Sequence, residues 1–151
     1  MDALLTTPAS LTALYAAGIF FMSGLLTGAW KYLEMMKSEQ YRAPFYVDVA
    51  HRASLLYSFA ALLVAIFAYY CSQSDVNQTV TLIATVAPLV FFGLSIALYI
   101  VLGLKNETNN QLRDDKAPGL TVWFMRGLML GEIGGFGILF YGFYQYASQL
   151  A

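Results

Sequence analysis

The sequence contains very few of the residues that usually cross-link a fold or carry its chemistry. Its 151 residues include one cysteine, Cys71, and one histidine, His51. A single cysteine excludes an intramolecular disulfide and a metal cluster held by cysteines. Charged residues make up 11% of the chain, far below the roughly 25% of soluble domains. The sequence has no basic face of the kind that binds nucleic acid. Its start also lacks the cationic segment that is typical of a cleaved signal peptide.

The sequence instead contains four long apolar stretches. The chain is 59% hydrophobic, and a membrane-spanning helix needs roughly 20 mostly apolar residues. The stretches cover residues 11–32, 47–70, 80–104 and 120–146. Strands are excluded because an open strand leaves backbone groups unsatisfied in lipid. We therefore predict an all-α integral membrane four-helix bundle, forming one domain over residues 1–151 in the inner membrane of a bacterium.

The cationic residues predict the orientation of this bundle. All eight lie in or beside the first and third loops: Lys31, Lys37, Arg42 and Arg52, then Lys105, Arg113, Lys116 and Arg126. The second loop, residues 71–79, has none, and neither tail has any. Because loops rich in lysine and arginine stay in the cytoplasm, both termini are predicted to lie on the non-cytoplasmic side.

Glycines recur at helical spacing in two of the stretches. Gly127, Gly131 and Gly135 lie four residues apart, as do Gly24 and Gly28. Small residues at this spacing let helix backbones approach closely in lipid. The pattern fits packing within one bundle and an interface between copies equally well.

His51 is the first candidate for a site. It lies at the cytoplasmic end of its helix, and Ser54 and Ser58 follow at positions that share its face. The ordinary interpretation is an interfacial histidine that caps or snorkels. The alternative is a ligand role, and a lone histidine suits haem, which needs one proximal imidazole, better than zinc.

Glu132 is the second candidate, because it lies near the middle of the last stretch. A carboxylate at the bilayer midplane costs roughly 3 kcal/mol. We therefore expect Glu132 to be protonated, paired or facing a cavity. An interhelical hydrogen bond and a catalytic acid are both open interpretations.

The remaining candidates are hydroxyls and amides near the cytoplasmic side. The hydroxyl of Tyr57 or Tyr99 could donate to a bound oxygen, although aromatic packing explains most tyrosines. Asn106 and Asn110 follow the third stretch. They could cap its end or line a cytoplasmic opening.

Three short stretches resemble the small four-helix membrane isomerases typified by styrene oxide isomerase, and more distantly hydroxylaminobenzene mutase. They are the glycine-containing residues 24–28, the run that begins Ala50-His51 and extends to Tyr57, and residues 97–110, where Tyr99 precedes an asparagine-containing loop. The likeness covers all four helices in layout, and these stretches in detail.

The resemblance implies a membrane-bound haem b isomerase that rearranges a small hydrophobic aryl epoxide to a carbonyl compound. His51 would be the ligand of the iron, with Ser54 and Ser58 beside the cofactor, and the group would lie between subunits of a homotrimer. Ferric iron would act as a Lewis acid on the epoxide oxygen, and Tyr99 would hydrogen-bond that oxygen. Tyr57 stands where the isomerase has an asparagine, so it would reshape the pocket and change the preferred substrate.

Two other classes of function remain open from the residues alone. The glycines of the last stretch and the short loops suit a non-enzymatic membrane subunit. The single histidine also suits a haem-carrying electron-transfer protein, whose second axial ligand would have to be methionine, tyrosine or lysine.

Overall fold

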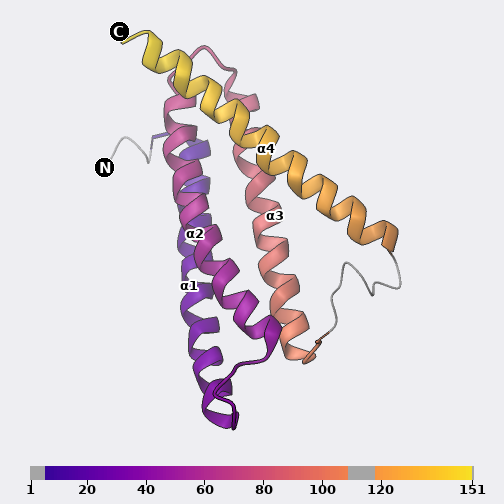
Figure 1. The fold of residues 1–151 in the computed structure, drawn as a ribbon. Helices are drawn as coiled ribbons and strands as arrows, with labels where there is room; N and C mark the ends of the chain where they lie inside the picture. The colour runs from indigo at the N-terminus through magenta and orange to yellow at the C-terminus, as the bar shows by residue number, and fades with distance from the viewer. Residues whose placement is uncertain (1–5, 109–117, 151) are drawn as a thin grey trace.

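The computed structural model describes residues 6–108 and 118–150, which form four helices and no strand (Figure 1). The helices are α1 (Pro8–Lys37), α2 (Phe45–Ser72), α3 (Gln78–Leu104) and α4 (Pro118–Ser148). All four are long and apolar enough to cross a membrane. The all-α prediction with four spanning helices is therefore confirmed, and the observed helices contain the predicted stretches.

Polar caps explain why α1 and α3 begin before their apolar stretches. Thr7 accepts a hydrogen bond from the backbone N–H of Ser10 at 3.2 Å, and Pro8 occupies the first turn of α1. Asn77 caps α3 by accepting from the N–H of Thr79 at 2.8 Å. These side chains satisfy N–H groups that the first turn of a helix leaves free. An apolar stretch marks the part of a helix in lipid, whereas the caps mark its real ends.

The other end of α1 extends beyond its predicted limit for a similar reason. Its last turn is polar, and Lys37 forms an ion pair with Glu34 at 2.8 Å one turn earlier. A side-chain pair at this spacing supports helical structure in water. The helix therefore continues past the apolar stretch into the first loop.

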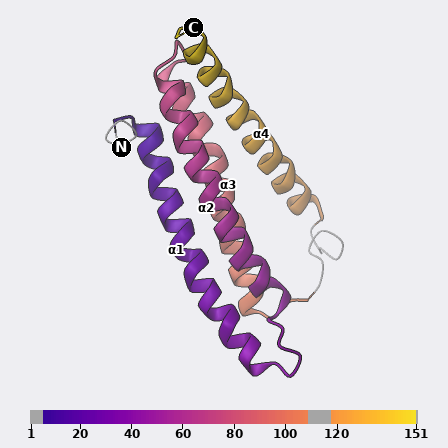
Figure 2. The same ribbon diagram turned by 60° about the vertical axis from the view of Figure 1, so that its left-hand side comes forward.

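The four helices are not arranged with equal contact. In both views α1, α2 and α3 run side by side, whereas α4 lies across α2 and α3 near its C-terminal end and leans away toward its beginning (Figures 1 and 2). Within the described residues α4 contacts α2 and α3 but not α1. The start of α1 and the end of α4 lie at the same end of the molecule, as an even number of spans requires.

Small side chains allow the close packing of α1, α2 and α3. Ala13 on α1 and Ala61, Ala65 and Ala68 on α2 are completely buried. Phe20 fills the space between α1 and the glycine at position 93 of α3. Alanine at the contact brings backbones close, which increases van der Waals contact between helices.

The glycines of α4 pack against α3 of the same chain. A Cβ added to Gly131 would lie 2.9 Å from the ring of Phe91, and one added to Gly135 would lie 2.6 Å from the backbone oxygen of Ala84. Gly127 also faces Phe91. Of the two interpretations of this pattern, the structure supports packing within one bundle.

We predict that Gly135→Ala destabilises the fold and that the adjacent Gly134→Ala does not. The new methyl group at position 135 would meet a backbone oxygen, which cannot rotate away, whereas nothing lies within 4 Å of a Cβ at position 134. Overpacking of this kind costs about 1–3 kcal/mol. Thermal unfolding of both variants in the same detergent tests this, and equal melting temperatures would contradict it.

Candidate functional site

His51 lies on the seam between α1 and α2. Its Nδ1 atom is 2.9 Å from the backbone oxygen of Gly24. A carbonyl can only accept, so Nδ1 carries the proton in the neutral ring and Nε2 carries the lone pair. Nε2 has no hydrogen bond within residues 6–108 and 118–150, and it is not among the buried unpartnered atoms there. The free nitrogen of the ring therefore reaches the surface.

The glycines of α1 provide the space that this imidazole occupies. A Cβ on Gly28 would lie 2.8 Å from Cε1 of His51, and a Cβ on Gly24 would lie 2.6 Å from the side chain of Leu55. Thr27 also donates to the Gly24 carbonyl, at 3.1 Å. The spacing of Gly24 and Gly28 thus holds a histidine ring against the α1 backbone as well as bringing two helices together.

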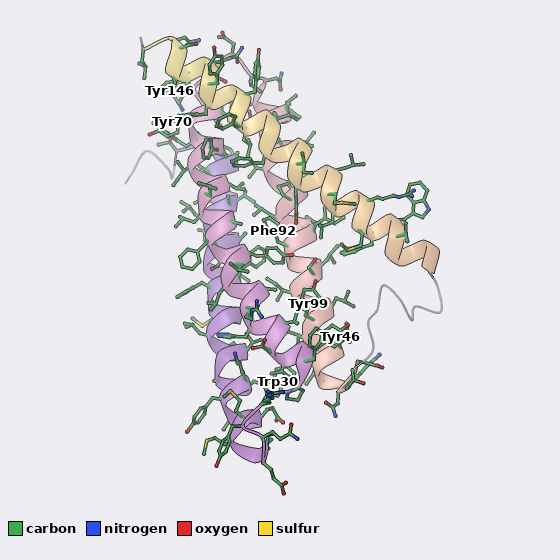
Figure 3. All side chains as sticks on the ribbon, viewed as in Figure 1. Trp30, Tyr46, Tyr70, Phe92, Tyr99 and Tyr146 are labelled. Atoms are coloured by element: carbon green, nitrogen blue, oxygen red, sulfur yellow. The ribbon has the colours of Figure 1, made fainter. Side chains whose placement is uncertain are left out.

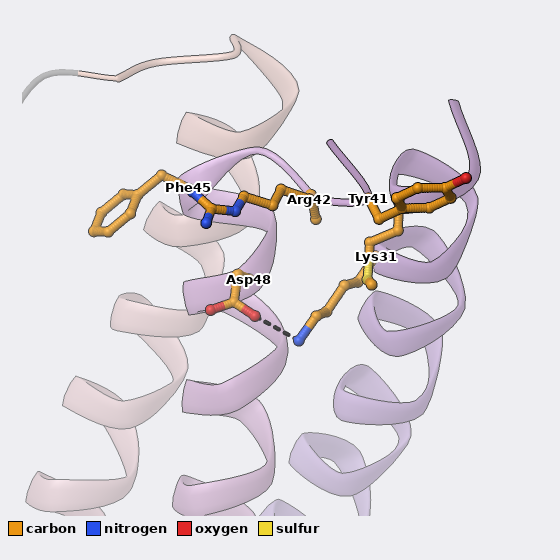
Figure 4. Close-up of a pocket in the computed structure, with 7 residues that line it drawn as sticks. Lys31, Tyr41, Arg42, Phe45 and Asp48 are labelled. Atoms are coloured by element: carbon orange, nitrogen blue, oxygen red, sulfur yellow. Dashed lines mark ion pairs between the residues drawn. The ribbon is translucent and has the colours of Figure 1, made fainter. Parts of the chain in front are cut away.

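An ion pair lies on the same seam, near the loop that joins α1 and α2. Lys31 of α1 bonds to Asp48 of α2, and the side chains of Tyr41, Arg42 and Phe45 surround a cavity of about 290 Å³ beside it (Figure 4). Arg52 approaches the other oxygen of Asp48 at 3.6 Å. Asp48 has one negative charge and two cations beside it. This group therefore has a net positive charge, one turn from His51.

Ser54 and Ser58 are both buried, but their hydroxyls are used within α2. Ser54 donates to the backbone oxygen of Ala50 at 2.7 Å, and Ser58 donates to that of Leu55 at 2.7 Å. Serine in an apolar helix commonly bonds in this way. The structure places both near His51 in the chain, with no hydrogen bond from either to the histidine.

Tyr57 belongs to a different side of α2, the one that faces α3. Its ring stacks on Phe92, with centroids 4.4 Å apart and planes 12° from parallel. The Ser95 hydroxyl, one turn further along α3, interacts with the Tyr57 hydroxyl. The α2–α3 contact therefore carries polar groups as well as aromatic packing.

Tyr99 continues this arrangement toward the C-terminal end of α3. It lies one turn beyond Ser95 on α3 and stacks with Tyr46 of α2 at 6.3 Å (Figure 3). Tyr57 and Tyr99 are close enough to interact electrostatically. The two predicted tyrosines therefore lie in one group, which we call the tyrosine cluster: Tyr46, Tyr57, Ser95 and Tyr99.

His51 and the tyrosine cluster occupy separate faces of α2. Residues 51 and 57 are six apart, which is about 240° around a helix. His51 faces α1, Tyr57 faces α3, and no hydrogen bond joins His51 to Tyr57 or Tyr99 in the described part of the chain. One copy of the chain therefore does not bring the predicted ligand and the predicted hydroxyl together.

Asn106 ends helix α3, which is one of the two roles that the sequence suggested for it. Its φ of 52° is left-handed, its N–H bonds to the Gly103 oxygen, and the N–H of Glu107 bonds to the Leu102 oxygen. This pattern ends a helix by satisfying its last carbonyls. Asn106 also borders a cavity at the first loop, whereas Asn110 lies outside the described residues.

Glu132 faces a small cavity between α2, α3 and α4. Its Oε1 atom is buried and has no hydrogen-bond partner among the described residues. The predicted interhelical hydrogen bond is therefore not formed by this oxygen. Of the expected arrangements, the structure shows the one in which the carboxyl group faces a cavity.

Two parts of this arrangement were missed in the sequence. The partner of His51 is a backbone oxygen, which no pattern of side chains reveals, although the coincidence of a glycine pair and a histidine on neighbouring helices is a usable signal. Ser95 was also missed. It lies three residues after Phe92 and four before Tyr99, so helical spacing alone places all three on one face.

Comparisons with protein families, curated proteins and solved structures found no match to this chain.

We predict that the neutral imidazole of His51 is protonated at Nδ1. Because the chain has one histidine, histidine labelled with ¹⁵N gives an NMR spectrum of this residue alone. Gly28→Ala should alter that spectrum by displacing the ring, whereas Gly18→Ala, with nothing within 4 Å of its added Cβ, should not. A neutral form protonated at Nε2 in the unaltered chain would contradict the assignment.

Proposed function

We propose that this protein is a haem b-dependent membrane isomerase that opens a small hydrophobic aryl epoxide and rearranges it to a carbonyl compound. The proposal rests on the resemblance of the sequence together with one observation, the arrangement of His51. A membrane site suits this chemistry, because an apolar epoxide partitions into the bilayer.

The hydrogen bond between His51 and the Gly24 oxygen is the observation that carries the proposal. Histidines that bind a metal through one ring nitrogen usually donate the other N–H to a carbonyl or carboxylate. Here Nδ1 has such an acceptor at 2.9 Å and Nε2 has no partner in the described part of the chain. The ring is thus fixed in the tautomer and orientation that a proximal ligand needs.

Other residues of the seam also fit a porphyrin. No group of three or more His, Cys, Asp or Glu side chains in the described residues could hold a bare metal ion, whereas a porphyrin brings its own four nitrogens. Lys31 and Arg52, which share Asp48 near His51, can pair with propionate carboxylates. The exposed apolar side chains of α1, such as Leu25 and Leu26, offer a surface for a flat macrocycle.

Haem iron would supply a Lewis acid for the epoxide oxygen. The Tyr99 hydroxyl would donate a hydrogen bond to the same oxygen, since a fixed donor stabilises charge that develops there. The neighbouring rings of Tyr57 and Phe92 would face the carbocation formed on ring opening. Because His51 and the tyrosine cluster lie on different faces of α2, the proposal requires a homo-oligomer in which one copy supplies His51 and its neighbour supplies Tyr99.

A non-enzymatic membrane subunit is the alternative proposal, and the glycines of α4 bear on it. The glycines of α4 that motivated it pack against Phe91 and Ala84 of the same chain. They are thus already occupied without a partner protein.

We expect the protein purified in detergent from haem-supplemented cells to show a Soret band that His51→Ala abolishes. Tyr99→Phe serves as the matched control and should retain the band, because it does not change the ligand. A wild-type preparation without a Soret band, or an unchanged band in His51→Ala, would overturn the proposal. A six-coordinate, ligand-blocked spectrum would instead favour electron transfer.

We also predict that Tyr99→Phe lowers the rate of aryl epoxide isomerisation by about 10²–10³-fold, as the loss of one positioned donor commonly does. Gas chromatography of the carbonyl product measures the rate. Tyr70→Phe is the control, because Tyr70 packs against Tyr146 at the opposite end of the molecule (Figure 3) and should leave the rate unchanged. Equal rates for Tyr99→Phe and wild type would exclude this role for the hydroxyl.

A further inference from the structure

The cavity that Glu132 faces has a wall that is otherwise apolar. It has a volume of about 210 Å³ and lies where α2, α3 and α4 meet. Its lining consists of Ala60, Leu63, Val64, Pro88, Phe92, Glu132 and Phe136. A carboxyl group is thus the single titratable side chain of the lining, in a part of the molecule that lies within the bilayer.

Glu132 differs from the buried hydroxyl groups of the same helices. Ser54, Ser58, Ser72 and Thr85 each donate to a carbonyl of their own helix. Oε1 of Glu132 is buried without any partner among the described residues. An unsatisfied buried polar atom costs about 1–3 kcal/mol, and such atoms are rare enough to need an explanation. One explanation is a ligand that supplies the missing hydrogen bond.

The size of the cavity indicates which part of a ligand it can hold. A closed cavity of about 150 Å³ holds benzene, and this cavity, which is open on one side, has about 210 Å³, enough for one aromatic ring and a short substituent. Phe92 and Phe136 provide aromatic walls for such a ring.

The carboxyl group determines which substituent fits. A carboxylate accepts hydrogen bonds only, and a carboxylic acid both donates and accepts. A hydroxyl group, which also does both, can pair with either form. We propose that this cavity is a binding site for a small monocyclic aromatic alcohol, with the ring between Phe92 and Phe136 and the hydroxyl bonded to Glu132.

This site is adjacent to the tyrosine cluster but needs neither haem nor His51. Phe92 of the lining stacks on Tyr57, which places the cavity beside the α2–α3 contact. Its lining includes no residue of the α1–α2 seam. Phe92 borders both this cavity and the tyrosine cluster, but binding at Glu132 is measured without haem or turnover, so its failure is distinguishable from a failure of the proposed isomerase activity.

Binding of 4-fluorobenzyl alcohol and 4-fluorotoluene tests the proposal. The two probes share a ring, and only the first carries a hydroxyl. Both are titrated into the full chain in detergent micelles and followed by ¹⁹F NMR, with partitioning into protein-free micelles subtracted. We expect saturable binding in which the alcohol is favoured about fivefold, the effect of one hydrogen bond.

Three variants identify the site. Glu132→Leu should remove the preference for the alcohol, whereas Glu132→Gln, which keeps a donor and an acceptor, should retain it. Ala60→Leu fills the cavity and should abolish binding of both probes, and Ala97→Leu, at an exposed position of α3, should not. Circular dichroism and gel filtration check that each variant folds.

Several outcomes overturn the inference. They are equal affinity of the two probes for the wild-type chain, absence of saturable binding, a preference for the alcohol that persists in Glu132→Leu, and binding that persists in folded Ala60→Leu. Because the measurement uses no haem, a missing Soret band would leave its result intact.

Discussion

Helices in a bilayer gain little free energy from burying apolar side chains against one another, because the surrounding lipid is equally apolar. Van der Waals contact between closely spaced backbones has to supply the attraction instead. In this protein the close spacing depends on small residues, mainly glycine. Gly24 and Gly28 admit His51 and Leu55, Gly131 admits Phe91, and Gly135 lies against the Ala84 oxygen. Each pair joins a glycine on one helix to a larger group on the next. The position of the histidine is therefore a product of helix packing, and the chemistry proposed for it cannot be separated from the fold.

The second constraint is that polar groups inside the bilayer need partners. Most hydroxyl groups meet it locally by bonding to their own helix, as Ser54 and Thr85 do. His51 meets it across the α1–α2 seam with one nitrogen and keeps the other free. Glu132 does not meet it with Oε1. The proposals rest on these two groups, one for a metal cofactor and one for a small alcohol.

The sequence was sufficient to predict four helices, because long apolar stretches have few other structures available in lipid. It also identified His51, Tyr57, Tyr99 and Glu132 as unusual from their place in those stretches. It could not show that His51 faces α1 while Tyr57 faces α3, since that depends on which helices are neighbours. Nor could it reveal the Gly24 oxygen as a partner or the cavity beside Glu132, which forms where side chains of three successive helices meet. The polarity derived from the cationic residues stays a prediction.

The inclination of α4 has a consequence for how the protein responds to its membrane. Its apolar part, Val122–Ser148, has 27 residues, or about 40 Å of helix, against a hydrocarbon core of about 30 Å. A helix longer than the core tilts to stay covered. Since α4 contacts α2 and α3 and not α1 among the described residues, a change in its tilt would reach the His51 seam only through α2. Bilayer thickness would then act more directly on the cavity beside Glu132 than on the His51 site.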